Sequence, residues 1–296
     1  MSFGPHLFLA LLEGTVGAFV LALTALGLSL VFGVMRIVNV AHGEFFMLGA
    51  VLAWFCASRV ESPLGGFLFA LVAAPLVVGG IALAADRLVL RRVDYHPEST
   101  IVATIGMLYI IQQAVLTLYG PDAHPIAPPV YFRIEFPWFG YSGYKLVVAG
   151  IAAALLGATW WILTRTTLGL YMRAAQQDLE MAQAMGVPAR RVYATVFALG
   201  AMLAAAAGVL VVPIQQAHYL MGLDPLLLSF IVVILGGLGS VKGTLIAAFV
   251  VGLSDGIVSV FFSPTLAKIV ATLLVAAVLI VRPTGLFGQA SGQPRP

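Results

Sequence analysis

The chain has 296 residues, of which 61% are hydrophobic and 9% are charged, whereas about 25% of the residues in a soluble domain are charged. We therefore predict a polytopic α-helical membrane protein in a lipid bilayer, since the alternating segments of roughly ten residues that mark a β-barrel are absent. The net charge of only +3 argues against a nucleic-acid-binding surface, and the single cysteine, Cys56, excludes an internal disulfide.

The first uncharged run, Gly14–Met35, is long enough to cross a bilayer once. Within it, Ala25, Ser29 and Gly33 are small residues four positions apart, so they share one face of a helix. Small residues on one face let a neighbouring helix approach closely. This run is therefore expected to pack tightly against another span.

The next stretch, GVMRIVNVAHGEFFMLGA, is interrupted by four polar residues: Arg36, Asn39, His42 and Glu44. The apolar run after them, Phe45–Ser58, makes only about 21 Å of helix, against a hydrocarbon core of roughly 30 Å. To cross, this helix has to begin near Val38, which brings Asn39, His42 and Glu44 toward membrane depth. Polar groups at that depth are functional candidates, so we predict that these three belong to a translocation pathway. The alternative is a plain turn outside the bilayer with a snorkelling Glu44.

Three further uncharged runs predict spans at Ser62–Ala85, Ser99–Pro121 and Leu146–Thr164. Between the last two, residues 120–143 form a loop that is rich in proline and aromatic residues. That composition is too irregular for a helix.

Residues 165–191 form the longest charged connection between spans. From Leu168 to Met185 the sequence predicts one helix with a loosely apolar side. Gly186 is a plausible cap for its C-terminus, and Pro188 prevents simple continuation. The length favours a short helical element outside the bilayer, and the alternative is a solvated linker.

The uncharged run Val192–Leu223 is too long for one simple span, and Pro213 is expected to end its helix. Pro225–Val241 follows and ends in the sequence GGLGS. Two last spans are predicted at Thr244–Phe262 and Leu266–Val281.

These runs give nine hydrophobic segments, and placing the N-terminus outside distributes the basic residues unevenly. Four of the 15 basic residues then lie outside: Arg59, Arg133, Lys145 and Lys268. The other eleven lie inside. This positive-inside bias predicts a periplasmic N-terminus, a cytoplasmic C-terminus, a periplasmic loop 120–143 and a cytoplasmic connection 165–191. The open alternative is that Pro225–Val241 re-enters instead of crossing, which would change the side of the C-terminus.

Each half of the chain contains one short, broken hydrophobic segment, a pattern that points to a central transport pathway. In the second half the break contains Gly236, Gly237, Gly239 and Ser240, and glycine lets backbone groups line a cavity where a helix stops. We therefore count these four residues as pathway candidates. The alternative is that the glycines only allow tight helix packing.

Several kinds of chemistry are missing from the sequence. Lys242 follows Val241, so the segment GLGSVKGT lacks the Gly-Lys-Ser/Thr of a phosphate-binding loop. No His/Cys metal spacing and no Gly-x-Ser-x-Gly elbow is present. Glu44 and Asp255 are the main carboxylates near membrane depth, which is few for an ion-coupled carrier. We therefore predict a transporter subunit without enzymatic activity, driven by another component.

Three motifs carry a resemblance to a known family. Gly33–Ala50 resembles the signature of LivH-type permeases, the membrane subunits of branched-chain amino-acid ABC importers. Residues 167–174, followed by 178–182 and Gly186, are similar to the cytoplasmic loop of this family. The Gly-rich residues 236–240 form the third match. All three motifs occur in order, so the resemblance covers nearly the whole chain.

The resemblance implies an all-α fold: a single transmembrane permease domain, residues 1–296, with about 8–9 hydrophobic segments and discontinuous or re-entrant helices. It also implies a bacterial inner-membrane complex. The expected partners are a second related permease, most simply as a heterodimer, two cytoplasmic ATPase subunits and a periplasmic substrate-binding protein. The chain itself would need no cofactor, because the ATPase subunits use the ATP.

The same resemblance implies roles for the two long connections. The helix within residues 165–191 would be a coupling helix seated in a groove of an ATPase subunit. The residues implied in this coupling loop are Arg173, Asp178, Glu180, Ala182 and Gly186. The loop 120–143 would face the binding protein.

The resemblance favours leucine, isoleucine and valine as substrates. This inference rests on the resemblance alone, because the sequence shows no substrate pocket. Related permeases for urea, amides or other amino acids carry similar motifs and remain alternatives. An ion-coupled secondary carrier that works alone is a second class of function, and a membrane scaffold without transport is a third. The broken polar segments in both halves argue against the scaffold.

Overall fold

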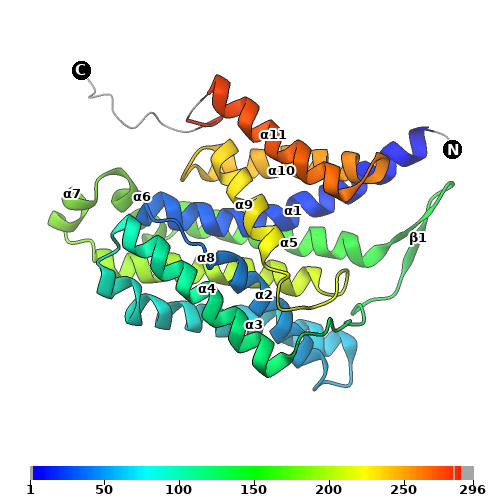
Figure 1. Ribbon diagram of the computed structural model, residues 1–296, viewed down its shortest axis with the longest axis horizontal. Helices are drawn as coiled ribbons and strands as arrows, with labels where there is room; N and C mark the ends of the chain where they lie inside the picture. The colour runs from blue at the N-terminus through cyan, green and yellow to red at the C-terminus, as the bar shows by residue number, and fades with distance from the viewer. Residues whose placement is uncertain (1–2, 283, 288–296) are drawn as a thin grey trace.

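The computed structural model describes residues 3–282 and 284–287. These residues form a helical bundle in which the axes of the long helices are roughly aligned (Figure 1). Seven helices in the described part are long and apolar enough to cross a membrane: α1 (Phe3–Met35), α3 (Pro63–Leu88), α4 (Pro97–Tyr119), α5 (Gly143–Arg165), α8 (Ala189–Val211), α10 (Val241–Phe261) and α11 (Pro264–Val281). Two apolar helices are shorter: α2 (His42–Ala57) and α9 (Leu223–Gly236). The expected polytopic helical bundle is confirmed.

The remaining elements lie at the two ends of the bundle (Figure 1). One end, here the α7 end, carries the short helices η1 (Leu90–Val93), α6 (Thr167–Gln177) and α7 (Leu179–Ala184). The other end, here the hairpin end, carries the antiparallel strands β1 (Arg133–Glu135) and β2 (Gly140–Ser142). The loop 120–143 is thus free of helix up to Ser142, as predicted, although it contains a short hairpin that the sequence pattern did not indicate.

Local sequence explains several of the helix boundaries. Proline occupies the first helical position of α3, α4 and α11, where its missing N–H costs nothing. The hydroxyls of Ser62, Ser240 and Ser263 accept hydrogen bonds from the first turns of α3, α10 and α11. Helix α8 ends at Val211, so Pro213 lies just beyond a helix end, as expected.

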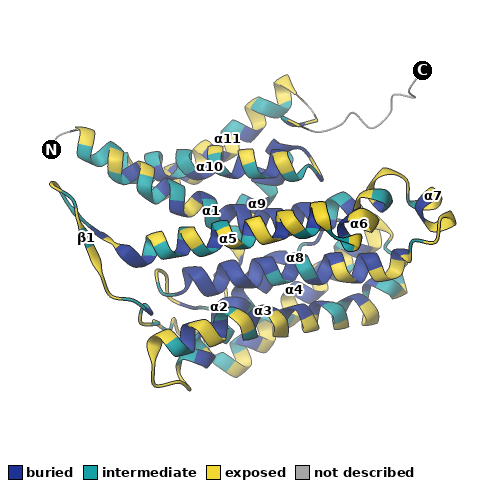
Figure 2. Cartoon of the chain, turned by 180° about the vertical axis from the view of Figure 1, so that it is seen from behind, coloured by how far each residue is buried: buried dark blue, intermediate teal, exposed yellow. Residues whose placement is uncertain are grey.

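Helices α1 and α8 form the centre of the bundle, and both are mostly buried (Figure 2). They pack with almost no side chain between them at Gly27 and Gly200, where an added Cβ on either residue would meet the backbone of the other. Of the predicted stripe of small residues on α1, Ser29 faces α10, where the hydroxyl of Thr244 donates to it at 2.9 Å, and Gly33 faces Gly239 in the turn before α10.

The two short helices each complete a crossing that begins in extended chain. Helix α1 ends at the α7 end, and residues 36–41 then run back into the bundle without helix. His42, the first residue of α2, bonds to the carbonyl of Thr24, which lies about 16 Å before the end of α1. Helix α2 therefore begins inside the bundle, at His42 rather than near Val38 as we expected.

Helix α9 mirrors this arrangement in the opposite direction. Residues 212–222 run inward from the hairpin end, where Ala217 pairs with His124 of the loop 120–143. Helix α9 then starts where Gly222 contacts Gly43, and the stretch after it reaches Gly33 at the α7 end. Residues 212–241 together thus cross the bundle, so Pro225–Val241 completes a crossing rather than re-entering, and the described ends of the chain lie at opposite ends of the bundle (Figure 1).

The connection 165–191 differs from the predicted single helix. Helix α6 stops at Gln177, and Asp178 adopts an extended conformation before α7 begins. The Asp178 carboxylate accepts a hydrogen bond from the Met181 N–H at 2.9 Å, so it caps a new helix. An aspartate that can cap a helix start explains why one apolar pattern became two helices.

Candidate functional site

Asn39, His42 and Glu44 lie together at the interior start of α2, and we call them the polar centre. All three are buried. His42 Nε2 donates to the Thr24 carbonyl at 2.9 Å, and Glu44 Oε1 accepts from Gln112 Nε2 of α4 at 3.0 Å. The three residues that the sequence singled out do lie together in the structure, and their role in translocation stays a prediction.

Each side chain of the polar centre has one satisfied atom and one unsatisfied atom. Asn39 Oδ1 accepts from the Ala41 N–H at 3.1 Å, but Asn39 Nδ2, His42 Nδ1 and Glu44 Oε2 are buried and have no hydrogen-bond partner within the described chain. Buried polar atoms nearly always bind a protein group or water. The Glu44 carboxylate also lies in the first turn of α2, where the helix dipole favours negative charge. The polar centre is thus a fixed junction of three elements with spare hydrogen-bonding capacity.

The Gly-rich candidates lie elsewhere, at the α7 end. Gly237 and Gly239 have φ angles of 100° and 78°, which end α9 and turn the chain toward α10. Gly236 packs against Gly243, and Ser240 caps α10. The structure therefore separates these four residues from the polar centre, and each has a clear packing or turn-forming role.

A cavity of about 360 Å³ adjoins this Gly-rich turn. Gly239, Ser240 and Lys242 line one side, and Arg173 and Gln176 of α6 line another. Gln176 donates to the Gly239 carbonyl at 3.0 Å, which ties α6 to the turn. Asn39, His42 and Glu44 do not line this cavity, nor a second one that Trp54, Glu61 and Phe67 line near the hairpin end.

Four of the five predicted coupling residues are exposed, and two of these four form hydrogen bonds with backbone groups. Arg173 donates to the Leu163 carbonyl at the end of α5, Asp178 caps α7, and Ala182 is buried. Glu180 is exposed, and Gly186 takes a φ of 88° after α7, which confirms that it ends the helix. Sequence reasoning did not single out Met181, which is 61% exposed on α7.

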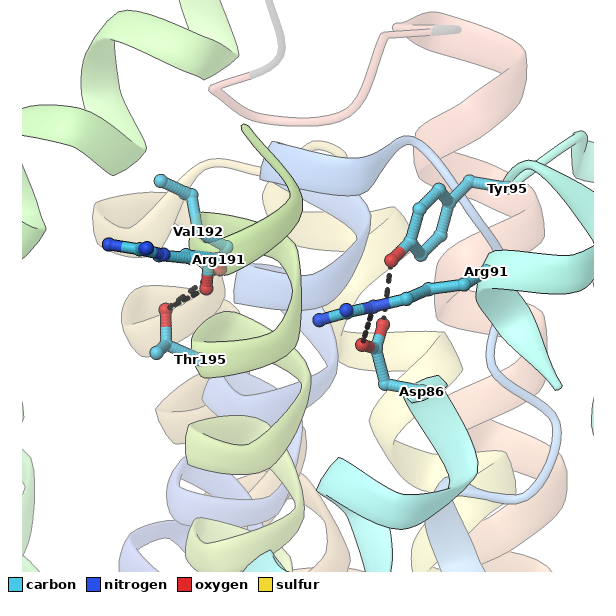
Figure 3. Close-up of polar contacts among 6 residues, drawn as sticks. All are labelled: Asp86, Arg91, Tyr95, Arg191, Val192 and Thr195. Atoms are coloured by element: carbon cyan, nitrogen blue, oxygen red, sulfur yellow. Dashed lines mark hydrogen bonds and ion pairs between the residues drawn. The ribbon is translucent and has the colours of Figure 1, made fainter. Parts of the chain in front are cut away.

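A second polar cluster, also missed by the sequence analysis, holds the connection between α3 and α4 (Figure 3). Asp86 is fully buried, and its carboxylate accepts from Arg91 Nε and from the Tyr95 hydroxyl, both at 2.9 Å. Burial, and then the hydrogen bond to Asp86, raises the pKa of Tyr95 to about 12. The Tyr95 ring also packs edge-on against Tyr193 of α8 at 4.9 Å. This cluster fixes the α7 end of α3 and α4 against α8.

Polar side chains also lie on the uncovered surface of α4. Tyr109, Gln113 and Thr117 are exposed, four residues apart, and Gln113 Nε2 donates to Thr117 Oγ1 at 3.4 Å. The sequence signal is the pair Gln112 and Gln113 within an otherwise apolar run, and an uncharged amide is less conspicuous there than a carboxylate. Within the described residues, no group of three or more His, Cys, Asp and Glu side chains is placed to hold a metal ion.

Comparison with known proteins gives a consistent family. A family model described as the permease component of branched-chain amino acid transport systems matches residues 10–279. The chain is 27% identical to the high-affinity branched-chain amino acid permease LivH of Salmonella typhimurium, over 90% of this chain and 91% of that protein. It is 28% identical to BraD of Pseudomonas aeruginosa, which carries the same description, over 96% of both chains.

A more distant relative carries a different name. The galactofuranose transporter permease YtfT of Escherichia coli is 25% identical over 88% of this chain and 76% of that protein. The family match nevertheless covers almost every described span, from α1 to α11. The chain therefore belongs to the family of branched-chain amino acid transport system permease components, and it is the membrane permease subunit of an ABC importer.

Proposed function

We propose that this permease carries branched-chain amino acids across the inner membrane of a bacterium. The observation that carries the proposal is the match to the family model over residues 10–279, together with nearly full-length relatives described as high-affinity branched-chain amino acid permeases. The fold supports it, because two crossings begin as extended chain and meet at helix starts inside the bundle, an arrangement common in transporters.

We further propose that two cytoplasmic ATPase subunits drive the permease at the α7 end. The basic residues of the charged connection lie at that end and support a cytoplasmic location. The hairpin end would then be periplasmic, with the N-terminus, and would receive substrate from a binding protein. A second permease subunit completes the membrane part of the complex.

Helix α7 is the part of the chain best suited to dock on an ATPase. It projects from the α7 end in Figure 1 and exposes Met181, while Met185 just after it is 80% exposed. Flexible methionines suit a surface that has to pack against a moving partner. Glu180 lies beside them and supplies a charge at the rim of such a contact.

The proposal is tested by uptake of labelled leucine into proteoliposomes. We expect uptake only when this permease is combined with its partner permease, both ATPase subunits, the binding protein and internal ATP. Uptake by the single chain under an ion gradient would establish the secondary carrier instead. If the complete, ATP-loaded complex carried an amide or a sugar but not leucine, the substrate would be wrong and the importer correct; the name of the relative YtfT makes a sugar worth including.

The coupling surface is tested by reversing a charge. Glu180→Arg should uncouple ATP hydrolysis from uptake and lower leucine uptake about tenfold, while the amount of assembled bundle stays unchanged. Arg173→Glu should have a similar effect but also loosen the corner between α5 and α6, because its guanidinium bonds to Leu163. Glu61→Arg, a reversal on the exposed turn at the hairpin end, controls for the effect of charge on assembly and should leave ATP hydrolysis coupled to uptake. Normal uptake in the Glu180 variant would remove α7 from the docking surface.

A further inference from the structure

We propose that the exposed stripe of α4 formed by Tyr109, Gln113 and Thr117, here the α4 stripe, lines the aqueous passage through which the solute moves, with the second permease subunit closing the opposite side. This inference rests on the proposed function, since it assumes that the chain works as one of two permeases. It assigns the passage to the outside of the single bundle rather than to the buried polar centre.

The geometry of α4 places these side chains on one line at membrane depth. Residues four apart follow each other along one helix face. Tyr109 is 65% exposed and lies about 15 Å from the hairpin end of α4, close to the middle of the span. Gln113 lies about 9 Å from the same end, still within the length of a hydrocarbon core.

The α4 stripe cannot face lipid without cost, because hydrocarbon offers no partner for an amide. Helix α3 shows what a lipid-facing surface of this chain looks like. Its exposed large side chains at membrane depth are all aliphatic or aromatic: Leu68, Phe69, Val72, Leu76, Val77 and Ile81. No such restriction holds on α4, where Gln113 is exposed and its only described side-chain bond is a long one to Thr117. The α4 stripe is therefore covered by water or by protein in the complex.

A second exposed polar group supports the same side of the bundle. Asp224, in the first turn of α9, accepts from Lys268 of α11 at 2.7 Å, and both side chains are at least half exposed. Helices α4, α9 and α11 lie toward the viewer in Figure 1. Lys268 lies four residues from the start of α11, near the hairpin end, and an exposed ion pair there is satisfied by water or by a protein partner rather than by lipid. The α4 stripe and the Asp224–Lys268 pair thus both identify this side of the bundle as one that lipid does not cover. A second permease that presents polar side chains would provide hydrogen-bond partners for both groups.

The chemistry of the α4 stripe fits the passage of a zwitterionic amino acid. An amide, a phenol and a hydroxyl can each donate to a carboxylate, and their oxygens can accept from an ammonium group. None of the three side chains carries a charge that would bind the solute strongly. Conduction requires binding sites that are weak enough for the solute to leave them.

Neighbouring glutamines also link the α4 stripe to the polar centre. Gln112 is turned inward and donates to the buried Glu44, while Gln113 next to it is exposed. Glu44 thereby acts as a positioning residue that fixes the rotation of α4. The polar centre supports the passage without contacting the solute.

Thiol labelling of the assembled importer tests the proposal. Cys56 is the single cysteine of the chain, so Cys56→Ser gives a background without thiols in this subunit. Gln113→Cys, and Thr117→Cys as a second variant, would be treated in open membranes with a positively charged methanethiosulfonate reagent during ATP turnover. We expect both to react. Leu76→Cys on the exposed face of α3 is the control and should react only with a membrane-soluble maleimide.

Two labelling outcomes would overturn the proposal. If Gln113→Cys and Thr117→Cys behaved like the α3 control, the α4 stripe would face lipid. If they reacted with neither reagent, a dry contact would cover it. Labelling does not depend on which solute is carried, so it fails or succeeds separately from the leucine uptake experiment. As a functional readout, Gln113→Leu should lower uptake about tenfold while the complex assembles and still hydrolyses ATP, and unchanged uptake would also count against the proposal.

Discussion

Helices α3 and α4 are neighbours in the chain, and both leave most of their surface uncovered in the single subunit. Only 39% of the most apolar segment of α3 is buried, and 22% of that of α4. Yet the uncovered side of α3 is apolar along the span as far as Arg87 in its last turn, while that of α4 carries Tyr109, Gln113 and Thr117. Exposure of a membrane helix in one subunit therefore has two meanings, contact with lipid or contact with water and a partner, and side-chain chemistry distinguishes them.

The largest expected difference between the two faces comes from adding one charge to each. Leu76→Arg places a guanidinium near the centre of α3, where it costs about 2.5–3.5 kcal/mol for insertion at a lipid-facing position. We expect this variant to lower the amount of membrane-inserted protein severely. Gln113→Arg should insert at close to the wild-type level, because the side chain it replaces already requires water, but it should abolish leucine uptake. Quantifying inserted protein in washed membranes and uptake in proteoliposomes separates the two effects.

The comparison would fail if both arginine variants inserted equally poorly, because α4 would then face lipid as α3 does. Leu76→Met, which keeps the volume and the apolar character of the side chain, is the control for a packing effect on α3. It should match the wild-type protein in both insertion and uptake.

The spans themselves followed from the sequence, because long uncharged runs have no other stable location. The starts of the two short helices did not, because tertiary contacts set them. Helix α2 begins at His42, where the ring reaches the carbonyl of Thr24, and α9 begins where Gly222 contacts Gly43. Neither contact leaves a local signal. A helix that spans alone has to start near Val38, whereas in the structure the extended residues 36–41 cover the missing distance.

The candidate site was predicted in part. Asn39, His42 and Glu44 were found because polar residues in an apolar run are conspicuous, and they do lie together. Their burial on all sides could not be read from spacing, and it favours a positioning role over contact with the solute. Gln113 was overlooked because an uncharged amide barely disturbs an apolar run. Which of two adjacent glutamines points outward is decided by Glu44, a residue 68 positions away from Gln112.

An intermediate loss of uptake is expected from a change at Glu44, the residue of the polar centre that bonds to α4. Glu44→Ala removes the acceptor of the Gln112 amide, and a partly buried donor left without a partner costs about 1 kcal/mol, the lower end of the range for a fully buried one. Helix α4 then loses a constraint on its rotation, so the thermal midpoint of the purified complex should fall by several degrees and uptake about tenfold. Glu44→Gln keeps an oxygen acceptor and should recover most of the uptake.

Glu13→Ala is the matched control for this loss. Glu13 pairs with Lys145 at 2.6 Å near the hairpin end, and both side chains are partly exposed. A partly exposed pair contributes about 0–1 kcal/mol, so uptake should change little. Equal and mild effects of the two alanine variants would mean that the polar centre does not control α4.

The smallest expected effect uses one methyl group on each face. Gly80 on α3 and Gly106 on α4 both point into open space, since an added Cβ would meet nothing within 4 Å at either position. Alanine is the better helix former by about 0.8–1.0 kcal/mol, so on stability grounds alone both Gly→Ala variants should be neutral or slightly stabilising.

If lipid covers α3, Gly80→Ala keeps full uptake. If a second permease approaches α4 closely beside the α4 stripe, the methyl group of Gly106→Ala separates the two helices, because small residues permit close contact. Uptake should then fall about twofold to threefold while the isolated subunit stays as stable as Gly80→Ala. Identical behaviour of the two variants in the assembled importer would place the partner on another side of the bundle.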